Sequence, residues 1–376
     1  MRRLWIFAFI GILLFWLLLR FVVTLKWGNK YFSFKQNLDL SQSSSKIYVA
    51  NEWDGTISVI DPLDREVIKT IDLSQQYYGK YLRYAPHNVQ VSPNGDIVIV
   101  SANIFSQDWD HTKNVNNDQL IFINPTIDEI SSRMDIAIDA HLAHVVIHPT
   151  KPLAYVVGWE KSVLYEVDIN QNIISQTITL PKDAWPHGIR LSPDGAFLYI
   201  AFIEGKSLAI IDTISYDMKI IAVPGKAVQV AVTSDDKYVF VSLYDTKSIV
   251  RYDLLTKNIE TLDLPDDSYW PVQLYPTPDN AYIYIADQWY YFDQPVGNRI
   301  YKINVEKFAI EQSYSWHSGP HGVVVSLDGA YAYITNIVDN TVSVIDVLQD
   351  AIVDTIVVGT MPNGVSMRTK EQGGTP

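Results

Sequence analysis

Residues 319–357, GPHGVVVSLDGAYAYITNIVDNTVSVIDVLQDAIVDTIV, hold four short apolar segments separated by polar turns. The segments YAYITN (331–336) and TVSVID (341–346) are rich in β-branched and aromatic residues. Apolar alternation over a few residues predicts half-buried β-strands, and SLDG (326–329) predicts a tight reversal between two of them. The stretch therefore predicts one antiparallel sheet of four strands.

The same unit recurs along the chain, and each copy begins with a short apolar strand that ends in a turn similar to S-P-D-G. The seven copies of this first strand are APHNVQVSPNG (85–95), LAHVVIHPTK (142–151), WPHGIRLSPDG (185–195), KAVQVAVTSDD (226–236), WPVQLYPTPDN (270–280), GPHGVVVSLDG (319–329) and MPNGVSM (361–367). Between His87 and the equivalent Asn363, six repeats fill 276 residues, which gives a period of 46.

Four short strands per unit at this period are typical of a β-propeller with one blade per unit. The copy at 361–367 supplies only a first strand, and the strand IYVAN (47–51) stands at the other end of the repeats. We therefore predict an all-β, seven-bladed propeller over residues 46–369. Residues 363–368 are predicted to pair beside 47–51 and close the ring, and residues 370–376 are predicted to be a disordered tail.

The repeats resemble a known family. IYVANEWDGTISVIDPLDREVIKTI (47–71) and AYITNIVDNTVSVIDVLQDAIVDTI (332–356) are similar to the YVTN-type repeat of YncE-like propellers, and the PHG and SPDG segments match that family's next strand. The resemblance covers residues 46–368 and implies the seven-bladed fold. It leaves the function open, because similar propellers include surface-layer-type proteins, lactonases and the haem- or copper-binding propellers of denitrification enzymes.

Charge and composition exclude several classes of function. The chain has 29 Lys and Arg against 42 Asp and Glu, a net charge of −13, and this balance repels polyanions. We therefore expect no nucleic-acid partner. The chain has no Cys, which excludes disulfides, thiolate metal sites and cysteine nucleophiles.

Residues 1–30 predict a membrane anchor. The chain is apolar without a break from Leu4 to Leu19 and continues so to Leu25 beyond one arginine, which is long enough for a helix of roughly 30 Å. No small-residue cleavage site follows, so we predict one uncleaved transmembrane helix with a cytoplasmic N-terminus. The Ser/Gln-rich residues 31–45 are predicted to be a linker. The propeller is then expected in the periplasm or extracellular space, with the membrane as a partner through the helix.

Strand order decides which loops share a face of the propeller. Loops that join a fourth strand to the next first strand lie with those that join second to third strands, on what we call the upper face. The S-P-D-G turns lie on the lower face. Three upper-face loops are long, at 74–85, 104–117 and 288–297, and long insertions on one face favour a binding surface.

Histidines stand at the upper start of the innermost strands, and they are our candidate metal ligands: His87, His144, His187 and His321. Neutral imidazoles that converge can bind copper, zinc or a haem iron. Candidate hydrogen-bond partners for these rings are Asp108, Asp110, His111 and Asp287.

Other interpretations of the histidines stay open. His87 shares its period-2 parity with Val89, which favours packing between blades, and Val228, Val272 and Asn363 interrupt the ring. Structural packing or hydrogen bonding, with no cofactor, is one alternative, and a general base is the other.

Aromatic residues gather in the upper loops and predict a surface for a protein partner or a small ligand, because aromatic side chains give large contact area at low entropy cost. The predicted binding surface consists of Trp109, Trp185, Trp270, Trp289, Tyr290 and Trp316. Some aromatic residues of these loops are expected to pack within the blades.

An Asp or Asn ends the third strand of every repeat, and a residue repeated seven times is expected to cap the following turn rather than to catalyse. No nucleophile elbow, phosphate loop or zinc-protease motif is present. We therefore expect a membrane-anchored extracytoplasmic binding or scaffold module that uses its upper face, either alone or as a subunit of a membrane complex. The alternative is a metal- or haem-dependent redox protein, or a lactonase-like hydrolase, that uses the histidines.

Overall fold

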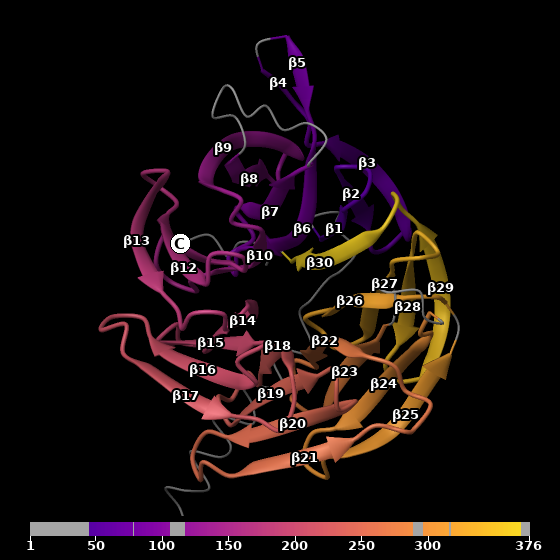
Figure 1. The fold of residues 1–376 in the computed structure, drawn as a ribbon. Helices are drawn as coiled ribbons and strands as arrows, with labels where there is room; N and C mark the ends of the chain where they lie inside the picture. The colour runs from indigo at the N-terminus through magenta and orange to yellow at the C-terminus, as the bar shows by residue number, and fades with distance from the viewer. Residues whose placement is uncertain (1–44, 78, 106–116, 289–295, 316, 370–376) are drawn as a thin grey trace, which may run out of the picture. The chain divides into compact units, whose positions relative to one another are not determined.

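A computed structural model describes residues 45–77, 79–105, 117–288, 296–315 and 317–369. Every regular element within these ranges is a strand, and the strands form seven four-stranded antiparallel sheets and one small hairpin (Figure 1). The prediction of an all-β, seven-bladed propeller is therefore confirmed. The predicted transmembrane helix at 1–30 lies outside the described residues, and within those residues we find no helix of sufficient length and hydropathy to cross a bilayer.

The strands of blades one to four follow each other from the axis outward. Blade one consists of β30 (Pro362–Arg368), β1 (Lys46–Asn51), β2 (Thr56–Asp61) and β3 (Glu66–Asp72); blade two of β6 (Tyr84–Val91), β7 (Val98–Ile104), β8 (Asn117–Asn124) and β9 (Glu129–Ile138); blade three of β10 (Leu142–Ile147), β11 (Leu153–Gly158), β12 (Val163–Asp168) and β13 (Ile173–Thr179); and blade four of β14 (Pro186–Leu191), β15 (Phe197–Phe202), β16 (Ser207–Asp212) and β17 (Met218–Ala222).

Blades five to seven repeat the same order. Blade five consists of β18 (Ala227–Val232), β19 (Tyr238–Leu243), β20 (Ser248–Asp253) and β21 (Ile259–Asp263); blade six of β22 (Pro271–Pro276), β23 (Tyr282–Asp287), β24 (Arg299–Asn304) and β25 (Ala309–Ser315); and blade seven of β26 (Pro320–Val325), β27 (Tyr331–Asn336), β28 (Thr341–Asp346) and β29 (Ala351–Val357). The hairpin of β4 (Gln75–Tyr77) and β5 (Lys80–Leu82) occupies the predicted long loop at 74–85.

The last strand closes the ring. β30 pairs antiparallel with β1, and the register places Lys46 opposite Arg368 and Val49 opposite Val365, so the predicted closure is confirmed. Arg368 also joins blade one to blade two, since its Nε donates to the carbonyl of Gly95 at 2.7 Å. A closed ring of short sheets leaves few free strand edges for aggregation.

The cores lie between neighbouring blades. The middle strands are buried on both faces, as in β1 and β11, whereas the fourth strands are mostly exposed with a few partly buried residues, as in β13. Large buried tyrosines recur at one position of the second strand, among them Tyr48, Tyr155 and Tyr199. Packing of this kind lets each sheet bury both faces although it is only four strands wide.

The innermost strands share an irregularity on which the site depends. In every blade the pairing of first and second strands breaks at the position that corresponds to His87. The breaks fall between Pro86 and Asn88, Leu142 and Val145, Pro186 and Ile189, Ala227 and Gln229, Pro271 and Leu274, and Pro320 and Val323, and opposite Val49 to Asn51 in blade one. A β-bulge adds a residue and re-aims side chains, so parity with Val89 does not determine where His87 points.

Asp and Asn residues at the ends of the third strands cap the next turn, as expected. Asn124 Oδ1, for example, accepts the Thr126 N–H at 2.9 Å. The equivalent bonds come from Asp61, Asp168, Asp212, Asp253, Asn304 and Asp346.

We expect Asn124→Ala to lower the free energy of unfolding by about 1 kcal/mol, because the turn loses its side-chain acceptor. Urea unfolding followed by far-UV circular dichroism measures this. Asn124→Asp keeps the acceptor and serves as the control; an equal loss in both variants would contradict a capping role.

Candidate functional site

The upper mouth of the axial channel brings three histidines together. His87 lies on β6, His144 on β10 and His187 on β14, each at the bulge of its innermost strand. Their ring centroids are 5.6 Å apart for His87 and His144, 5.5 Å for His87 and His187, and 5.0 Å for His144 and His187. One nitrogen from each ring lies within 4.8 Å of the other two, so the three imidazoles form one compact cluster.

Two of the rings each have one nitrogen engaged and the other available. His187 Nδ1 lies 3.1 Å from the carbonyl of Val228, to which it donates as Nδ1–H, and this leaves Nε2 as the lone-pair nitrogen. His87 Nδ1 faces Glu52 at 3.6 Å and the amide nitrogen of Asn363 at 3.4 Å. His87 Nε2 is buried and has no hydrogen-bond partner among the described residues. A buried ring nitrogen without a partner is rare, and it leaves this atom available to a ligand.

His144 is the most engaged ring. Its Nε2 lies 3.2 Å from the amide nitrogens of both Gln229 and Gln273. Gln229 Oε1 accepts the N–H of Val230 at 3.0 Å, so its NH₂ group faces the imidazole, and His144 Nε2 is the acceptor. The two glutamines come from blades five and six and reach across the axis to blade three.

The absence of a side chain at Gly188 leaves the space in which Gln229 reaches the axis. A Cβ on Gly188 would lie 2.1 Å from Oε1 of Gln229 and 2.5 Å from its Cα. The P-H-G sequence therefore has a structural reason for its glycine in blade four, because the next innermost strand packs directly against it.

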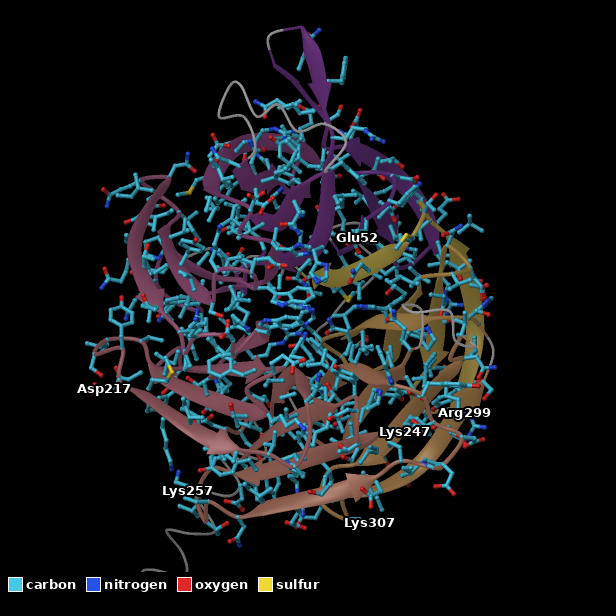
Figure 2. The ribbon with its side chains drawn as sticks, viewed as in Figure 1. Glu52, Asp217, Lys247, Lys257, Arg299 and Lys307 are labelled. Carbon is cyan, nitrogen blue, oxygen red and sulfur yellow. The ribbon has the colours of Figure 1, made fainter. Side chains whose placement is uncertain are left out.

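Glu52 supplies the negative charge of the site. It lies in the loop after β1, and its label in Figure 2 is near the centre of the ring, whereas Asp217 and Lys257 lie at the periphery. Burial acts to raise the pKa of Glu52, but the His87 ring and the Asn363 amide, which donates to it at 2.6 Å, hold that pKa below its usual value. Sequence inspection missed this residue.

The imidazoles of His144, His187 and His321 are neutral at pH 7. Burial lowers the pKa of His187 to about 3 and that of His321 to about 3, and the neighbouring His87 ring acts in the same direction. Burial and both neighbouring rings place the pKa of His144 well below its ordinary value. His321 occupies the bulge of blade seven, and its buried Nδ1 has no hydrogen-bond partner among the described residues. Neutral imidazoles are the form that binds metals.

An aromatic wall stands beside the cluster, formed by His141, Trp159 and Trp185. Trp159 contacts His141 at a centroid distance of 5.1 Å, Trp185 at 5.5 Å and His187 at 6.1 Å. Trp185 is exposed and has a left-handed φ of 55°, whereas Gly319 holds the equivalent position in blade seven at 72°. The backbone there favours glycine, and a bulky residue costs on the order of 1 kcal/mol, a cost also borne by Met361 at the equivalent position of blade one (φ 56°).

The other predicted surface residues divide into two groups. Trp270 is half-buried against Tyr244, with centroids 4.6 Å apart, so part of it belongs to blade packing. Trp109, Trp289, Tyr290 and Trp316 lie outside the described residues, as do the ring-partner candidates Asp108, Asp110 and His111.

Asp287 is not a partner of the histidines. Its carboxylate accepts the Ser268 hydroxyl at 2.9 Å and the Tyr269 N–H at 2.9 Å, so it ties the loop before β22 to β23. The prediction that it supports the cluster is wrong, because both of its carboxylate oxygens accept hydrogen bonds from that loop. The residues that do contact the rings are Glu52, Gln229, Gln273 and Asn363.

Burial raises the pKa of Asp287 to about 6, although its two hydrogen bonds oppose the shift. A carboxyl group with a raised folded-state pKa stabilises the fold below its unfolded pKa of about 4, and this contribution is lost as the pH rises through about 6. We expect Asp287→Asn, which keeps both contacts without a charge, to raise the free energy of unfolding at pH 7.5 by on the order of 2 kcal/mol and to flatten its rise toward pH 5. Urea unfolding across this range is the measurement. The exposed Asp266→Asn is the control; equal pH profiles for Asp287→Asn and the parent would contradict the assignment.

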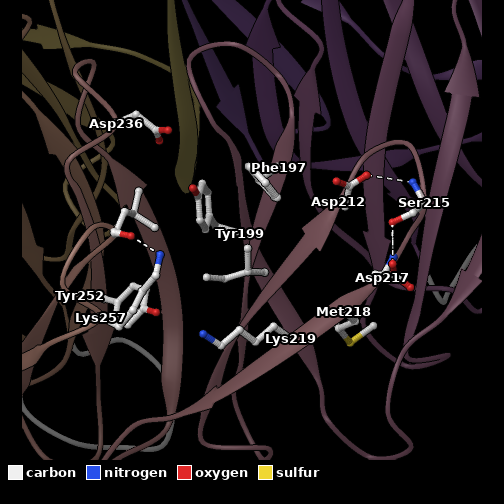
Figure 3. Close-up of a pocket in the computed structure, with 12 residues that line it drawn as sticks. Phe197, Tyr199, Asp212, Ser215, Asp217, Met218, Lys219, Asp236, Tyr252 and Lys257 are labelled. Carbon is white, nitrogen blue, oxygen red and sulfur yellow. Dashed lines mark hydrogen bonds between the residues drawn. The ribbon is translucent and has the colours of Figure 1, made fainter.

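A separate groove opens between blades four and five, on the lower face (Figure 3). Its volume is about 500 Å³, and charged groups of both signs line it, among them Lys219, Lys257 and Asp236. It is broad, and its Asp212 and Ser215 are occupied in the turn that follows β16. The converging imidazoles of the upper mouth are therefore the better candidate site.

Comparison with known proteins agrees with the architecture. The family model described as a YNCE-like beta-propeller matches residues 36–371. The fold is similar to that of Kuenenia stuttgartiensis hydrazine synthase (TM-score 0.63, 18% identity, 75% of this chain and 89% of that chain). It is also similar to a protein of unknown function from Desulfotomaculum acetoxidans (TM-score 0.68, 14% identity, 87% of this chain and 99% of that chain). No curated protein matches the sequence. At these identities the structural similarities show the fold alone.

Proposed function

The chain belongs to the YNCE-like β-propeller family, and on that premise we propose that it is a membrane-anchored, extracytoplasmic binding module whose ligand site is the upper mouth of the channel. The observation that carries the proposal is the convergence of His87, His144 and His187, with Glu52 beside them. The aromatic wall gives a ligand or partner protein an exposed contact surface next to the cluster.

The cluster suits a divalent transition metal. Three imidazoles and a carboxylate are nitrogen and oxygen donors of the kind that copper(II) and zinc(II) accept, and copper(II) binds such donors most tightly. Glu52 offsets part of the positive charge that the buried site would otherwise hold.

The distances show what binding requires. Metal–nitrogen bonds of about 2.0–2.1 Å place the nitrogens of a tetrahedral site roughly 3.3 Å apart, and here they lie within 4.8 Å. Side-chain rotations that move each ring nitrogen by an ångström or so bring the three nitrogens to that spacing. His87 and His187 present Nε2, and His144 completes the set once the amides of Gln229 and Gln273 release it.

Metal content tests the proposal. The full-length chain in lipid nanodiscs is stripped with chelator, dialysed separately against copper(II) and zinc(II), and analysed by inductively coupled plasma mass spectrometry. We expect one equivalent of copper(II) per chain that survives gel filtration. Absence of stoichiometric copper and zinc would overturn the metal-binding module.

Topology is tested separately. Alkaline phosphatase and green fluorescent protein are fused in turn to the C-terminus in a bacterial host. We expect phosphatase activity and no fluorescence, because the propeller lies outside the cytoplasm. The reverse pattern would contradict the proposed localisation and would leave the metal-binding proposal unaffected.

A metal-dependent redox protein or lactonase-like hydrolase is the second candidate. It is favoured by one observation, the carboxylate of Glu52 at 3.6 Å from His87 Nδ1, where it can accept a proton beside a bound metal. Metal-loaded protein that turns over a lactone panel or cycles a copper signal, with loss of this turnover in Glu52→Gln, would support the enzyme over the binding module.

A further inference from the structure

A second pocket occupies the lower mouth of the channel. Its volume is about 420 Å³, within the range of small-molecule sites, and the innermost strands of six blades contribute to it. Gln229, Gln273 and His144 are buried across the axis above it. The pocket is therefore distinct from the upper site, and it lies outside the function proposed above.

Among the residues that the structure describes, Arg190 is the only charged one that lines this pocket. Its Nη1 donates to the carbonyl of Ile189 at 2.8 Å, and no carboxylate among the described residues lies within ion-pair distance. This is unusual in a chain of net charge −13, in which the buried Arg251 pairs with Glu260 at 2.8 Å.

A partly buried guanidinium without a partner anion raises the free energy of the folded state. Burial lowers the pKa of Arg190, which means that the surroundings disfavour its charge, but an arginine stays protonated at neutral pH. A bound anion removes this cost and forms a two-point contact with the planar guanidinium. Tyr275, which lines the same pocket and couples electrostatically to Arg190, is kept neutral by the raised pKa that burial gives its hydroxyl. A neutral phenol is a second donor for the anion.

Most of the remaining wall is apolar, although the polar residues Gln90, Ser192, Ser234, Thr277 and Asn280 also line it. Val146, Leu191, Val232, Val325 and Leu327 line the pocket, and proline residues of the S-P-D-G turns form its rim. An inorganic anion makes no use of such a wall, whereas a molecule with an apolar body buries surface against it.

We propose that the lower mouth binds a small organic carboxylate, with its carboxylate on Arg190 and its apolar body against the valine and leucine side chains. One positive charge in the lining fits one negative charge in the ligand. The same chemistry is offered by a free carboxylic acid and by the C-terminal carboxylate of an apolar peptide.

The test uses calorimetric titration of the full-length chain in lipid nanodiscs. The free-acid probes are hexanoate and, as its neutral match, hexanamide; the peptide probes are Val-Val-Leu with a free and with an amidated C-terminus. We expect at least one carboxylate to bind ten-fold or more tightly than its amide. Preference for hexanoate assigns a free acid, and preference for the peptide carboxylate assigns a chain terminus.

Substitution locates the effect. Arg190→Met is expected to abolish the preference for carboxylate over amide, Arg190→Lys to retain part of it, and the exposed Lys219→Met to leave it unchanged. Arg190→Met is also expected to keep or raise the melting temperature, because it removes an uncompensated charge. The proposal is overturned if acids and amides bind alike in the parent, if neither binds, or if Arg190→Met keeps the preference. The parent comparison decides the matter even where a variant fails to fold.

Discussion

Replacing His187 by alanine is expected to weaken copper(II) binding to the full-length chain by at least about 100-fold. The ring presents Nε2 to the cluster while its Nδ1–H is held by the carbonyl of Val228, so its orientation is fixed before a metal arrives. Loss of one of three imidazoles leaves an incomplete donor set. Chelator-competition titration measures the affinity, and electron paramagnetic resonance counts the coordinated nitrogens.

The matched control is His317→Ala, which also removes an imidazole. His317 pairs with Asp339 and Thr355 at the outer side of blade seven and not with the cluster. We expect no change in copper affinity there. Equal affinity in His187→Ala and the parent would show that the cluster is inter-blade packing, the alternative that the sequence left open.

Replacing Gln273 by leucine is expected to strengthen copper(II) binding. Its amide lies 3.2 Å from His144 Nε2 and competes with a metal for that nitrogen. Gln273→Leu removes one of the two amides that compete for this nitrogen and removes no ligand, so copper affinity should rise about five-fold, the equivalent of one hydrogen bond of roughly 1 kcal/mol. A fall in affinity would mean that the amide helps to position His144.

Removal of residues 362–376 is expected to abolish folding. β1 then loses one of its two hydrogen-bonded neighbours. Blade two loses the Ser366 hydroxyl, which accepts the Val91 N–H at 3.0 Å, and the Arg368 bond to Gly95. A whole strand of buried contacts exceeds the roughly 5–15 kcal/mol by which domains are stable. Limited proteolysis and circular dichroism report the outcome.

The control for this deletion removes residues 370–376 alone, which lie outside the described residues. That shorter deletion is expected to leave the melting temperature within a degree or two of the parent. A folded, protease-resistant protein without residues 362–376 would mean that six blades and an open edge suffice.

Much of the fold follows from the repeats. Period, strand count and the split repeat, with three strands at the start and one at the end, predict seven blades and the β1–β30 closure, because each repeat can bury its faces only against its neighbours. The capping role of Asn124 and its equivalents follows from sevenfold recurrence. The hairpin β4–β5 does not follow, because no alternation marks the loop at 74–85 as strands.

The site was predictable in part. Registering the repeats places His87, His144 and His187 at one mouth, but the bulge that aims them is a property of strand pairing and has no sequence signature here. Gln229 and Gln273 carried a signal that we did not use: in the two blades where valine replaces histidine, glutamine comes next. Glu52 carried none, since it meets His87 only after the ring has closed.

Closure by the final strand also determines when the ring can close during biosynthesis. The edge of β1 is made when residue 51 is polymerised, yet its partner is not finished until residue 368, 317 residues later. At a translation rate of about 5–20 residues per second, the backbone N–H and C=O groups on this edge of β1 stay unpaired for roughly 15 to 60 s. To avoid aggregation, the nascent chain must either be bound by a chaperone or associate with other chains more slowly than its synthesis is completed.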